Sequence, residues 1–468
     1  MLQAHCVAAC RPLSSQGVRE IPILWRLSAR ARVLAQTLIV AACLLFIGLP
    51  QLLSAFDQSH RYATATQSDW EGTNNSLESA QCARKTGKWL LRSCDGDRIV
   101  PFSAEDPGQA LLLSAWARLA GRDATVMDVA RLNLGINALG LVVLVATLIT
   151  FGAFTTALVV LILGPTVFLS WFDTLPHWAL IGTVSMQLIL PLALVARTRR
   201  WVPPKVTAPL IAVGLLLLAF ASLLREAVGL SVLLVTIAAG AWTLWHDRHR
   251  RRRWVATIAI LAAAVVASQS SRLVVAARNA AYALDAANLP ATHGTSHTLY
   301  IGLGAVPNKW GIRYDDMVGV AAAEAAEPGV AIFSKDYFRV MSELYWRKWH
   351  EDPGEVVRIY LVKVAILLGD NVIALAPPLV VVLVLAIGIQ LLARHRRWTD
   401  GDRSGETRLA INLIVLGLIG LTLAQAMLAT PTRLYTMPTG PLILVLAGLA
   451  LENLASWAWR TMARPAAP

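Results

Sequence analysis

Long apolar runs, separated by short basic clusters, constrain this chain more than any other feature of its sequence. Several of these runs reach the roughly 20 residues that a helix needs to cross a bilayer. The chain is 56% hydrophobic and only 15% charged, whereas a soluble protein of ordinary composition carries about 25% charged residues. The sequence therefore predicts an all-α polytopic membrane protein.

Basic residues between the runs predict how the chain is threaded through the membrane. They form the clusters RLSARAR, RTRRW, HDRHRRRRW and ARHRRW, and such clusters mark cytoplasmic loops. About ten transmembrane helices follow from the runs and clusters together, near 34–54, 134–152, 154–172, 177–196, 207–224, 226–245, 254–268, 372–392, 407–428 and 440–458. With these spans, every strong cluster and both termini fall on the cytoplasmic side.

The formal net charge of +13 is explained by the same clusters. They are short and lie between apolar runs, a pattern that does not form a continuous face along a phosphate backbone. No nucleic-acid partner is expected. Arginine outnumbers lysine, and alanine and leucine are abundant. This composition indicates a GC-rich bacterial genome, so the expected location is a bacterial inner (plasma) membrane.

Two long polar segments divide the chain and are predicted to lie outside the cytoplasm as loops that carry juxtamembrane helices. The predicted parts are a basic leader, a first transmembrane module that includes the outer segment 55–133, a second outer segment, and a C-terminal three-helix part. Their bounds are 1–33, 34–268, 269–371 and 372–468.

Both outer segments contain predicted helices. In the first, Asp106 is a candidate N-cap, with Pro107 at the first helical position. In the second, SKDYFRVMSELYWRKWH (334–350) has amphipathic spacing. A further helix follows, with Asp352, Pro353 and Glu355 as cap, first-turn proline and capping-box acid. It is apolar with a few basic residues, so we expect it to lie at the membrane surface.

Cys82 and Cys94 lie close together in the first outer segment. Because the compartment outside the cytoplasm is oxidising, they are a candidate disulfide. No CxxC or Cys/His spacing in the chain predicts a zinc site.

The layout of spans and outer segments resembles the GT-C superfamily of polytopic glycosyltransferases. The likeness is to the branch of protein mannosyltransferases and lipid A aminoarabinose transferases, and it rests on EDPGQALLLSAWARLAGRDATVMDVARLNLGINALG (105–140). Asp57 stands alone in AFDQSH where that family carries an acidic pair, and Asp106-Pro107-Gly108 replaces a His-Pro-Pro motif. The resemblance implies a polyprenyl-phosphate-linked sugar as donor and partner in the membrane lipid, used on the outer face.

The chemistry that the resemblance implies needs a carboxylate and a cation. A base must accept the proton of the acceptor hydroxyl, and the leaving phosphate must be neutralised. Asp57 is the first candidate base because it lies where the first span emerges. Glu105 and Asp106 are further catalytic candidates, with helix capping as their alternative role. Arg225, in SLLREAVG, is a candidate phosphate ligand, with a salt-bridged turn at Glu226 as its alternative.

HTLYIGLGAVPNKWGIRYDD (297–316) interrupts the apolar pattern with glycines and aromatics. GLGAVP begins like a dinucleotide-binding loop, but Pro307 occupies the sixth position and no βαβ unit surrounds it. Asp315 and Asp316 are candidates for starting a helix or for contacting substrate or a divalent metal. The aromatic side chains of Tyr300, Trp310 and Tyr314 are candidates for stacking on sugars or for packing the loop onto the membrane-surface helices. No cofactor is certain, and the metal remains unknown.

The leading functional expectation is a membrane glycosyltransferase acting on an outer-face glycan, lipid or protein. A non-catalytic scaffold of envelope assembly with the same architecture is one alternative, and an oligosaccharide polymerase or ligase is another. A transporter or flippase ranks last, because the sequence shows no internal repeat and its spans hold few ionisable residues at mid-depth.

Overall fold

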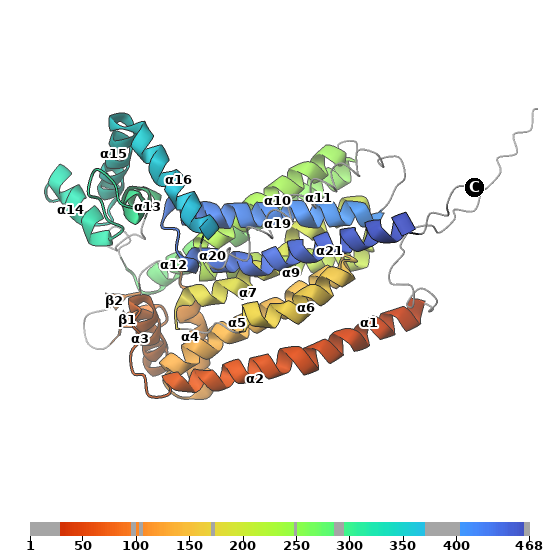
Figure 1. Ribbon diagram of the computed structural model, residues 1–468. Helices are drawn as coiled ribbons and strands as arrows, with labels where there is room; N and C mark the ends of the chain where they lie inside the picture. Colours follow the sequence, from red (N-terminus) through yellow and green to blue (C-terminus); the bar gives the residue numbers. More distant parts are fainter. Residues whose placement is uncertain are drawn as a thin grey trace, which may run out of the picture.

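The computed structural model describes residues 29–94, 100–102, 106–169, 174–247, 250–284, 294–369 and 403–462. Long helices run side by side in an elongated bundle, and two groups of shorter elements lie at the same end of it (Figure 1). The described residues form helices and one two-stranded antiparallel sheet. The predicted all-α class is confirmed.

The first half of the chain supplies the first outer segment and the centre of the bundle. Its elements are α1 (Ala29–Cys43), η2 (Leu44–Gly48), α2 (Leu49–Gln58), η3 (Ser59–Tyr62), α3 (Glu71–Thr86), β1 (Leu91–Ser93), β2 (Val100–Pro101), α4 (Gly108–Ala120), α5 (Val126–Thr150), α6 (Phe154–Phe168), η4 (Pro176–Ala179), α7 (Leu180–Ser185), η5 (Met186–Leu188), α8 (Ile189–Arg199), α9 (Pro204–Leu224) and α10 (Glu226–His246).

The second half supplies the second outer segment and the last described helices of the bundle. Its elements are α11 (Arg251–Ser268), α12 (Ser270–Ala281), α13 (Thr295–Gly302), η7 (Leu303–Ala305), α14 (Asp316–Ala326), α15 (Lys335–Glu351), α16 (Pro353–Gly369), α19 (Arg403–Leu428), α20 (Arg433–Thr436), η8 (Met437–Thr439) and α21 (Gly440–Met462).

Seven helices in the described part of the chain are long and apolar enough to cross a membrane. They are Leu34–Tyr62, Val126–Thr150, His177–Arg199, Pro204–Leu224, Glu226–His246, Gly405–Leu428 and Leu434–Leu454. The pair α11 and α12, bent by 54°, adds an eighth if it counts as one span. The predicted span 154–172 corresponds to the shorter apolar helix α6, and 372–392 lies outside the described residues. The chain is a multi-pass membrane protein.

The helices that flank the first outer segment reach further than the apolar runs indicate. The first candidate span continues to Tyr62, and the second begins at Val126. Thr125 and Asp128 form a reciprocal capping box that fixes the start of α5. Asp128 also holds Arg122 through two bonds of 2.7 Å. Both helices therefore extend by polar turns beyond the apolar runs at 34–54 and 134–152.

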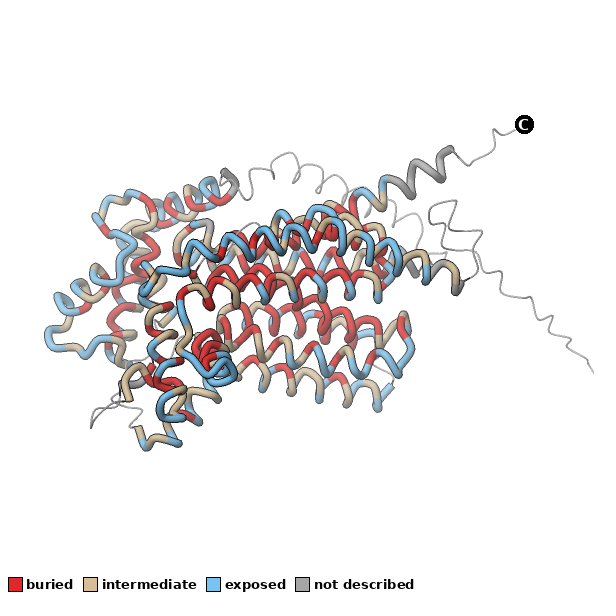
Figure 2. The backbone as a smooth tube through the Cα atoms, turned by 90° about the horizontal axis from the view of Figure 1, so that it is seen from below, coloured by how far each residue is buried: buried red, intermediate tan, exposed pale blue. Residues whose placement is uncertain are grey.

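One helical segment lies at the centre of the bundle. The span His177–Arg199 is buried along its whole apolar window, and buried residues concentrate on the inner helices (Figure 2). Glycines allow the close packing there: a Cβ on Gly140 would lie 2.3 Å from the Cα of Gly182. The α5 and α7 backbones therefore touch, as in membrane helix pairs that meet at small residues.

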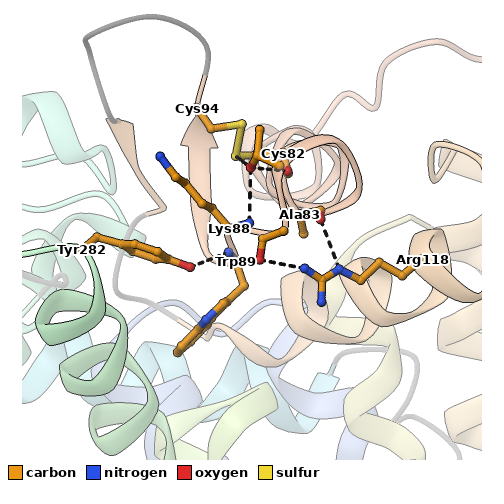
Figure 3. The surroundings of a disulfide bond; sticks show 9 residues. Cys82, Ala83, Lys88, Trp89, Cys94, Arg118 and Tyr282 are labelled. Carbon is orange, nitrogen blue, oxygen red and sulfur yellow. Dashed lines mark hydrogen bonds between the residues drawn. A yellow bond between two sulfur atoms is a disulfide. The ribbon is translucent and has the colours of Figure 1, made fainter.

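The first outer segment is held together by a disulfide and by backbone contacts. Cys82 of α3 and Cys94 after β1 are disulfide-bonded (Figure 3). Arg118 of α4 donates to the carbonyl oxygens of Ala83 and Gly87 at the end of α3. These contacts join α3, β1 and α4 into one unit.

A buried arginine docks this unit on the bundle. Arg278 of α12 is only 2% exposed, and its Nη1 donates to the carbonyl oxygens of Leu90 and Phe102 at 3.0 and 2.9 Å. Tyr282 accepts a hydrogen bond from the backbone N–H of Trp89. The first outer segment therefore rests on α12.

A buried lysine docks the second outer segment in the same manner. Lys363 of α16 is fully buried, and its Nζ donates to the carbonyl oxygens of Met427 and Ala429, both at 2.9 Å. A positive charge is favourable at the C-terminal end of a helix such as α19. A Cβ on Gly302 would lie 2.2 Å from the carbonyl oxygen of Leu428, so α13 also packs directly on this helix end.

The caps predicted in the second outer segment are largely confirmed. Asp315 accepts from the backbone N–H of Met317 at the start of α14. Asp352 accepts from the backbone N–H of Glu355 at the start of α16. The reciprocal half of the predicted capping box is replaced, because the Glu355 carboxylate accepts from Arg358 and from the backbone of Lys309. The amphipathic helix predicted at 334–350 is α15.

Replacing Gly140 by alanine should destabilise the bundle by about 1–3 kcal/mol, because the added methyl overpacks the contact with Gly182. Gly135 on the same helix is the matched control, since a Cβ there meets nothing within 4 Å. Gly135→Ala should be neutral or stabilise by up to about 1 kcal/mol. Equal unfolding temperatures for the two variants in detergent would contradict the α5–α7 contact.

The buried Lys363 predicts a pH dependence. Burial lowers the pKa of its ammonium group from 10.5 to about 7. The unfolded chain then binds more protons than the folded chain between these values, so stability rises with pH in that window. The difference in unfolding temperature, wild type minus Lys363→Met, should therefore increase from pH 7 to pH 9. The exposed Lys309, varied in the same way, should show no such increase; a constant difference for Lys363 would refute the prediction.

Candidate functional site

An ion pair joins the first outer segment to the helix bundle at the turn between α9 and α10. Nη1 of Arg225 donates to Oδ2 of Asp106 at 2.6 Å. The backbone N–H of Glu226, the first residue of α10, donates to Oδ1 of Asp106 at 3.2 Å. The two paired side chains are 22% and 21% exposed. A charge-assisted bond and a helix N-terminus therefore hold one carboxylate at the surface of the bundle.

The prediction that Asp106 caps its own helix is wrong. α4 begins at Gly108, and its N-cap residue Pro107 provides no side-chain cap. Asp106 has a φ of +48°, in the left-handed region that aspartate tolerates better than most residues. A Cβ on Gly108 would lie 2.8 Å from the backbone of Leu223. The Asp-Pro-Gly turn therefore fits onto the end of α9 and turns the carboxylate toward α10.

Charges alternate along the surface beside this pair. Glu226 forms an ion pair with Arg272 of α12, so the predicted pairing of Arg225 with Glu226 is replaced by two separate pairs. Arg272 is mostly exposed, whereas Arg225 is mostly covered. Two carboxylates and two guanidinium groups thus lie together where α4, α9, α10 and α12 meet.

Aromatic rings extend from Arg225 across the end of the bundle. Its guanidinium carbon lies 5.9 Å from the ring centroid of Tyr435. The ring of His177 meets that of Tyr435 edge-on at 5.9 Å, and Trp70 meets His177 edge-on at the same distance. His177 is 7% exposed, and its Nδ1 has no hydrogen-bond partner among the described residues. Trp70, at the start of α3, is 41% exposed.

The second outer segment reaches the same place through Tyr314. Its hydroxyl is hydrogen-bonded to that of Tyr435, and it lies within electrostatic reach of Arg225 and Asp316. Burial of the hydroxyl end, together with the neighbouring Tyr435, raises the pKa of the Tyr314 hydroxyl above its ordinary value. This hydroxyl therefore stays protonated at neutral pH. Both outer segments and the last span meet around Arg225.

The two adjacent aspartates of the second segment have different partners. Asp315 caps α14, whereas Oδ1 of Asp316 lies 3.1 Å from Nε2 of His297. The other ring nitrogen of His297 is hydrogen-bonded to the Tyr337 hydroxyl at 2.6 Å. Since His297 and Tyr337 are fully buried, this chain of bonds fixes α13, α14 and α15 to one another. Asp316 is the exposed end of that chain.

Asp57 and Glu105 do not join the cluster around Arg225 in the described structure. Asp57 is exposed on α2, two positions from the buried Ala55 and two from the buried Ser59. It is therefore about 200° round the helix from the face that packs on the bundle. Glu105 lies outside the described residues. Among the candidate catalytic carboxylates, the one that contacts Arg225 in the described part is Asp106.

Two of the three aromatic candidates for sugar binding, Tyr300 and Trp310, are engaged within the second outer segment. Tyr300 is 6% exposed and belongs to the core of that segment. Nε1 of Trp310 donates to Glu351 at 2.7 Å, and the ammonium groups of Lys309 and Lys348 lie over its ring. Their packing role is thus the one that the structure displays.

The described residues contain no group of three or more His, Cys, Asp or Glu side chains that could hold a metal ion. The cluster around Arg225 instead offers a fixed cation, a carboxylate, a protonated phenol and exposed aromatic surface. Such groups can bind an anion, accept a proton and hold an apolar ring face.

Three residues of this cluster were not singled out as site residues from the sequence. His177 is predicted to be an interfacial residue beside Trp178, and Trp70 and Tyr435 lie between the predicted spans. His177 is the one with a signal in the sequence, because it stands beside Trp178 next to an apolar run.

Comparison of the chain with protein-family models, curated proteins and solved structures finds no match in any of the three.

Proposed function

We propose that this protein is a membrane glycosyltransferase of GT-C type. It transfers a sugar from a polyprenyl-phosphate-linked donor to a glycan, lipid or protein acceptor on the outer face. The observation that carries the proposal is the Asp106–Arg225 pair. It sets a carboxylate beside a guanidinium at the end of the bundle, where two folded outer segments meet. The order of spans and outer segments supports the same class.

The pair supplies the two groups that sugar transfer needs. The acceptor hydroxyl oxygen attacks C1 of the sugar, the C1–O bond to the phosphate breaks, and the bonding electrons leave with the polyprenyl phosphate. Arg225 neutralises the charge that develops on the phosphate oxygens. When the phosphate engages this guanidinium, Asp106 loses one of its hydrogen bonds and accepts the proton of the acceptor. The Tyr314 hydroxyl donates a hydrogen bond to a substrate oxygen.

The orientation that we propose places the outer segments outside the cytoplasm of a bacterial inner membrane, with both termini inside. Basic residues support it, because Arg197 and Arg253 gather around Asp247 at the end of the bundle opposite the outer segments. Figure 1 shows the outer segments at one end and the start of α1 at the other. Such a distribution follows the positive-inside rule.

A scaffold of envelope assembly without catalytic activity is the second candidate. It is favoured by one observation: both carboxylate oxygens of Asp106 already have partners in the bundle. In that case the pair serves only to dock α4 on α10. The two functions differ in whether the chain turns over a donor.

Transfer should be measured with purified protein in liposomes, from radiolabelled polyprenyl-phosphate sugars to membrane acceptors. Asp106→Asn should slow transfer about a hundredfold or more, because it removes the proton acceptor. Arg225→Gln should slow it by about a hundredfold through loss of phosphate neutralisation. Asp69→Asn is the matched control, because Asp69 is exposed in the same segment.

Asp57→Asn separates the two candidate bases. We expect near-normal transfer, because Asp57 points away from the bundle. Loss of transfer in Asp57→Asn with full transfer in Asp106→Asn would overturn the assignment of the base. Absence of transfer by wild-type protein from every donor tried would favour the scaffold. Unfolding temperatures should show that each variant is folded.

The disulfide tests the orientation. In right-side-out membranes, an impermeant reductant should expose two thiols to an impermeant maleimide, seen as a mass shift. The double variant Cys82→Ser, Cys94→Ser should show no reductant-dependent shift. Labelling that requires permeabilised membranes would place the first outer segment in the cytoplasm and contradict the proposed orientation.

A further inference from the structure

The start of α11 lies at the end of the bundle opposite the outer segments (Figure 1), and a dense group of arginines lies around it. Arg197 and Arg199 belong to the last turn of α8, and Arg200 is the C-cap residue of that helix. α11 starts with three consecutive arginines, after Arg250 as its N-cap residue. Nη1 of Arg197 donates to Oγ1 of Thr257 of α11 at 3.3 Å. The two groups of arginines therefore lie side by side.

One buried carboxylate neutralises the inner part of this group. Asp247 is the C-cap residue of α10 and is only 5% exposed. Its Oδ1 accepts from Arg253 at 3.3 Å, and its Oδ2 accepts from the hydroxyl of Thr198 at 3.1 Å. Arg197 lies within electrostatic reach of both Asp247 and Arg253. One negative charge is therefore shared by two guanidinium groups.

The arginines further out carry charge that the described residues do not compensate. Arg250, Arg251 and Arg252 are exposed, and none of them forms an ion pair within the described part of the chain. α11 has no acidic residue in its first turn, although negative charge is what a helix N-terminus favours. An anion beside these side chains would reduce their mutual repulsion.

The orientation of the chain explains only part of this arrangement. Basic residues are expected at the cytoplasmic end of a membrane protein, but they need not gather at one helix start. The turn at 151–153 between α5 and α6 contains no charged residue, and it lies at the same end because α5 starts beside the first outer segment. The positive charge thus forms a local patch beside α11.

Exposed apolar residues follow the patch along one face of α11. Trp254, Val255 and Ile258 are 44%, 55% and 40% exposed. With Arg251 they occupy positions i, i+3, i+4 and i+7, so all four lie on the same face of the helix. Trp245, at the end of α10, is 70% exposed, and tryptophan favours the depth of lipid headgroups because its ring is amphipathic. This face therefore carries a charge at headgroup level and apolar side chains toward the bilayer centre.

We propose that the start of α11 binds the headgroup of an anionic glycerophospholipid from the leaflet at this end of the bundle. Arg251 and Arg252 bind the headgroup phosphate, since guanidinium groups match phosphate oxygens, and the acyl chains lie along Val255 and Ile258. A soluble phosphate would meet the arginines alone, so the apolar residues on the same face favour a lipid. In the proposed orientation this is the cytoplasmic leaflet, where basic clusters attract anionic lipids. The surface lies at the far end from Arg225, so the inference does not depend on sugar transfer.

Lipid binding to the full-length protein in detergent tests the proposal. The probes are phosphatidylglycerol, which is anionic, and phosphatidylcholine, which is zwitterionic, with identical acyl chains. Native mass spectrometry counts the lipids bound to each protein molecule as the probe concentration rises. Wild-type protein should bind phosphatidylglycerol about tenfold more tightly than phosphatidylcholine. Arg251→Gln with Arg252→Gln should weaken phosphatidylglycerol binding roughly tenfold, since each arginine contributes up to about fivefold, and should leave phosphatidylcholine binding unchanged.

Two further double variants show whether charge at this place is responsible. Arg251→Lys with Arg252→Lys keeps the charge and should keep most of the affinity. Arg313→Gln with Lys335→Gln removes the same charge from exposed positions of the second outer segment. Lys335 is the first residue of α15, as Arg251 is of α11. This matched control should bind phosphatidylglycerol as the wild type does.

Equal affinity of the wild-type protein for the two lipids would overturn the inference, as would equal losses in the glutamine variant of α11 and in the matched control. Displacement of phosphatidylglycerol by an equal concentration of sn-glycerol 3-phosphate would show that the ligand is a soluble phosphate and not a lipid. Added salt should weaken phosphatidylglycerol binding to the wild-type protein, because it screens exposed charges. This measurement needs no substitution, and binding that salt leaves unchanged would contradict the role of the arginines.

Discussion

Arg225 is the residue on which the outer end of the molecule depends. It is extended, and it separates α9 from α10, so its side chain emerges between two apolar spans. A guanidinium at that depth needs a counter-charge, and Asp106 provides it from another part of the chain. The same guanidinium lies over Tyr435, which binds Tyr314 of the second outer segment. One half-buried charge therefore connects three distant parts of the chain.

Both outer segments are attached through a buried basic side chain that donates to backbone carbonyl oxygens. Arg278 donates to the carbonyl oxygens of Leu90 and Phe102, which flank the two strands of the first segment, and Lys363 donates to those of Met427 and Ala429 at the end of α19. Carbonyl oxygens in the last turn of a helix have no partner within that helix, whereas the Leu90 oxygen also accepts from the backbone N–H of Phe102. Because Arg278 and Lys363 bind backbone oxygens, these contacts do not depend on which side chains the bonded residues carry.

The sequence predicted the fold class because an apolar run of about 20 residues has few alternatives to crossing a membrane. It predicted the caps at Asp315 and Asp352 because a cap joins residues two or three positions apart. It misassigned Asp106 because the partner of this carboxylate lies 119 positions away. The place of His177 in the cluster was not predicted for the same reason: its neighbours Trp70 and Tyr435 come from the first outer segment and the last span.

The separation of these partners along the chain has a consequence for biogenesis. Domains form from the N-terminus onward during synthesis, and Cys82 and Cys94, only 12 positions apart, are both present early. Asp106 must wait until α9 and α10 have been inserted, and the ring contact between His177 and Tyr435 until α20 has been made. The cluster around Arg225 is thus the last part to assemble, because a chain made only as far as α19 lacks the Tyr435 ring that contacts both Arg225 and His177.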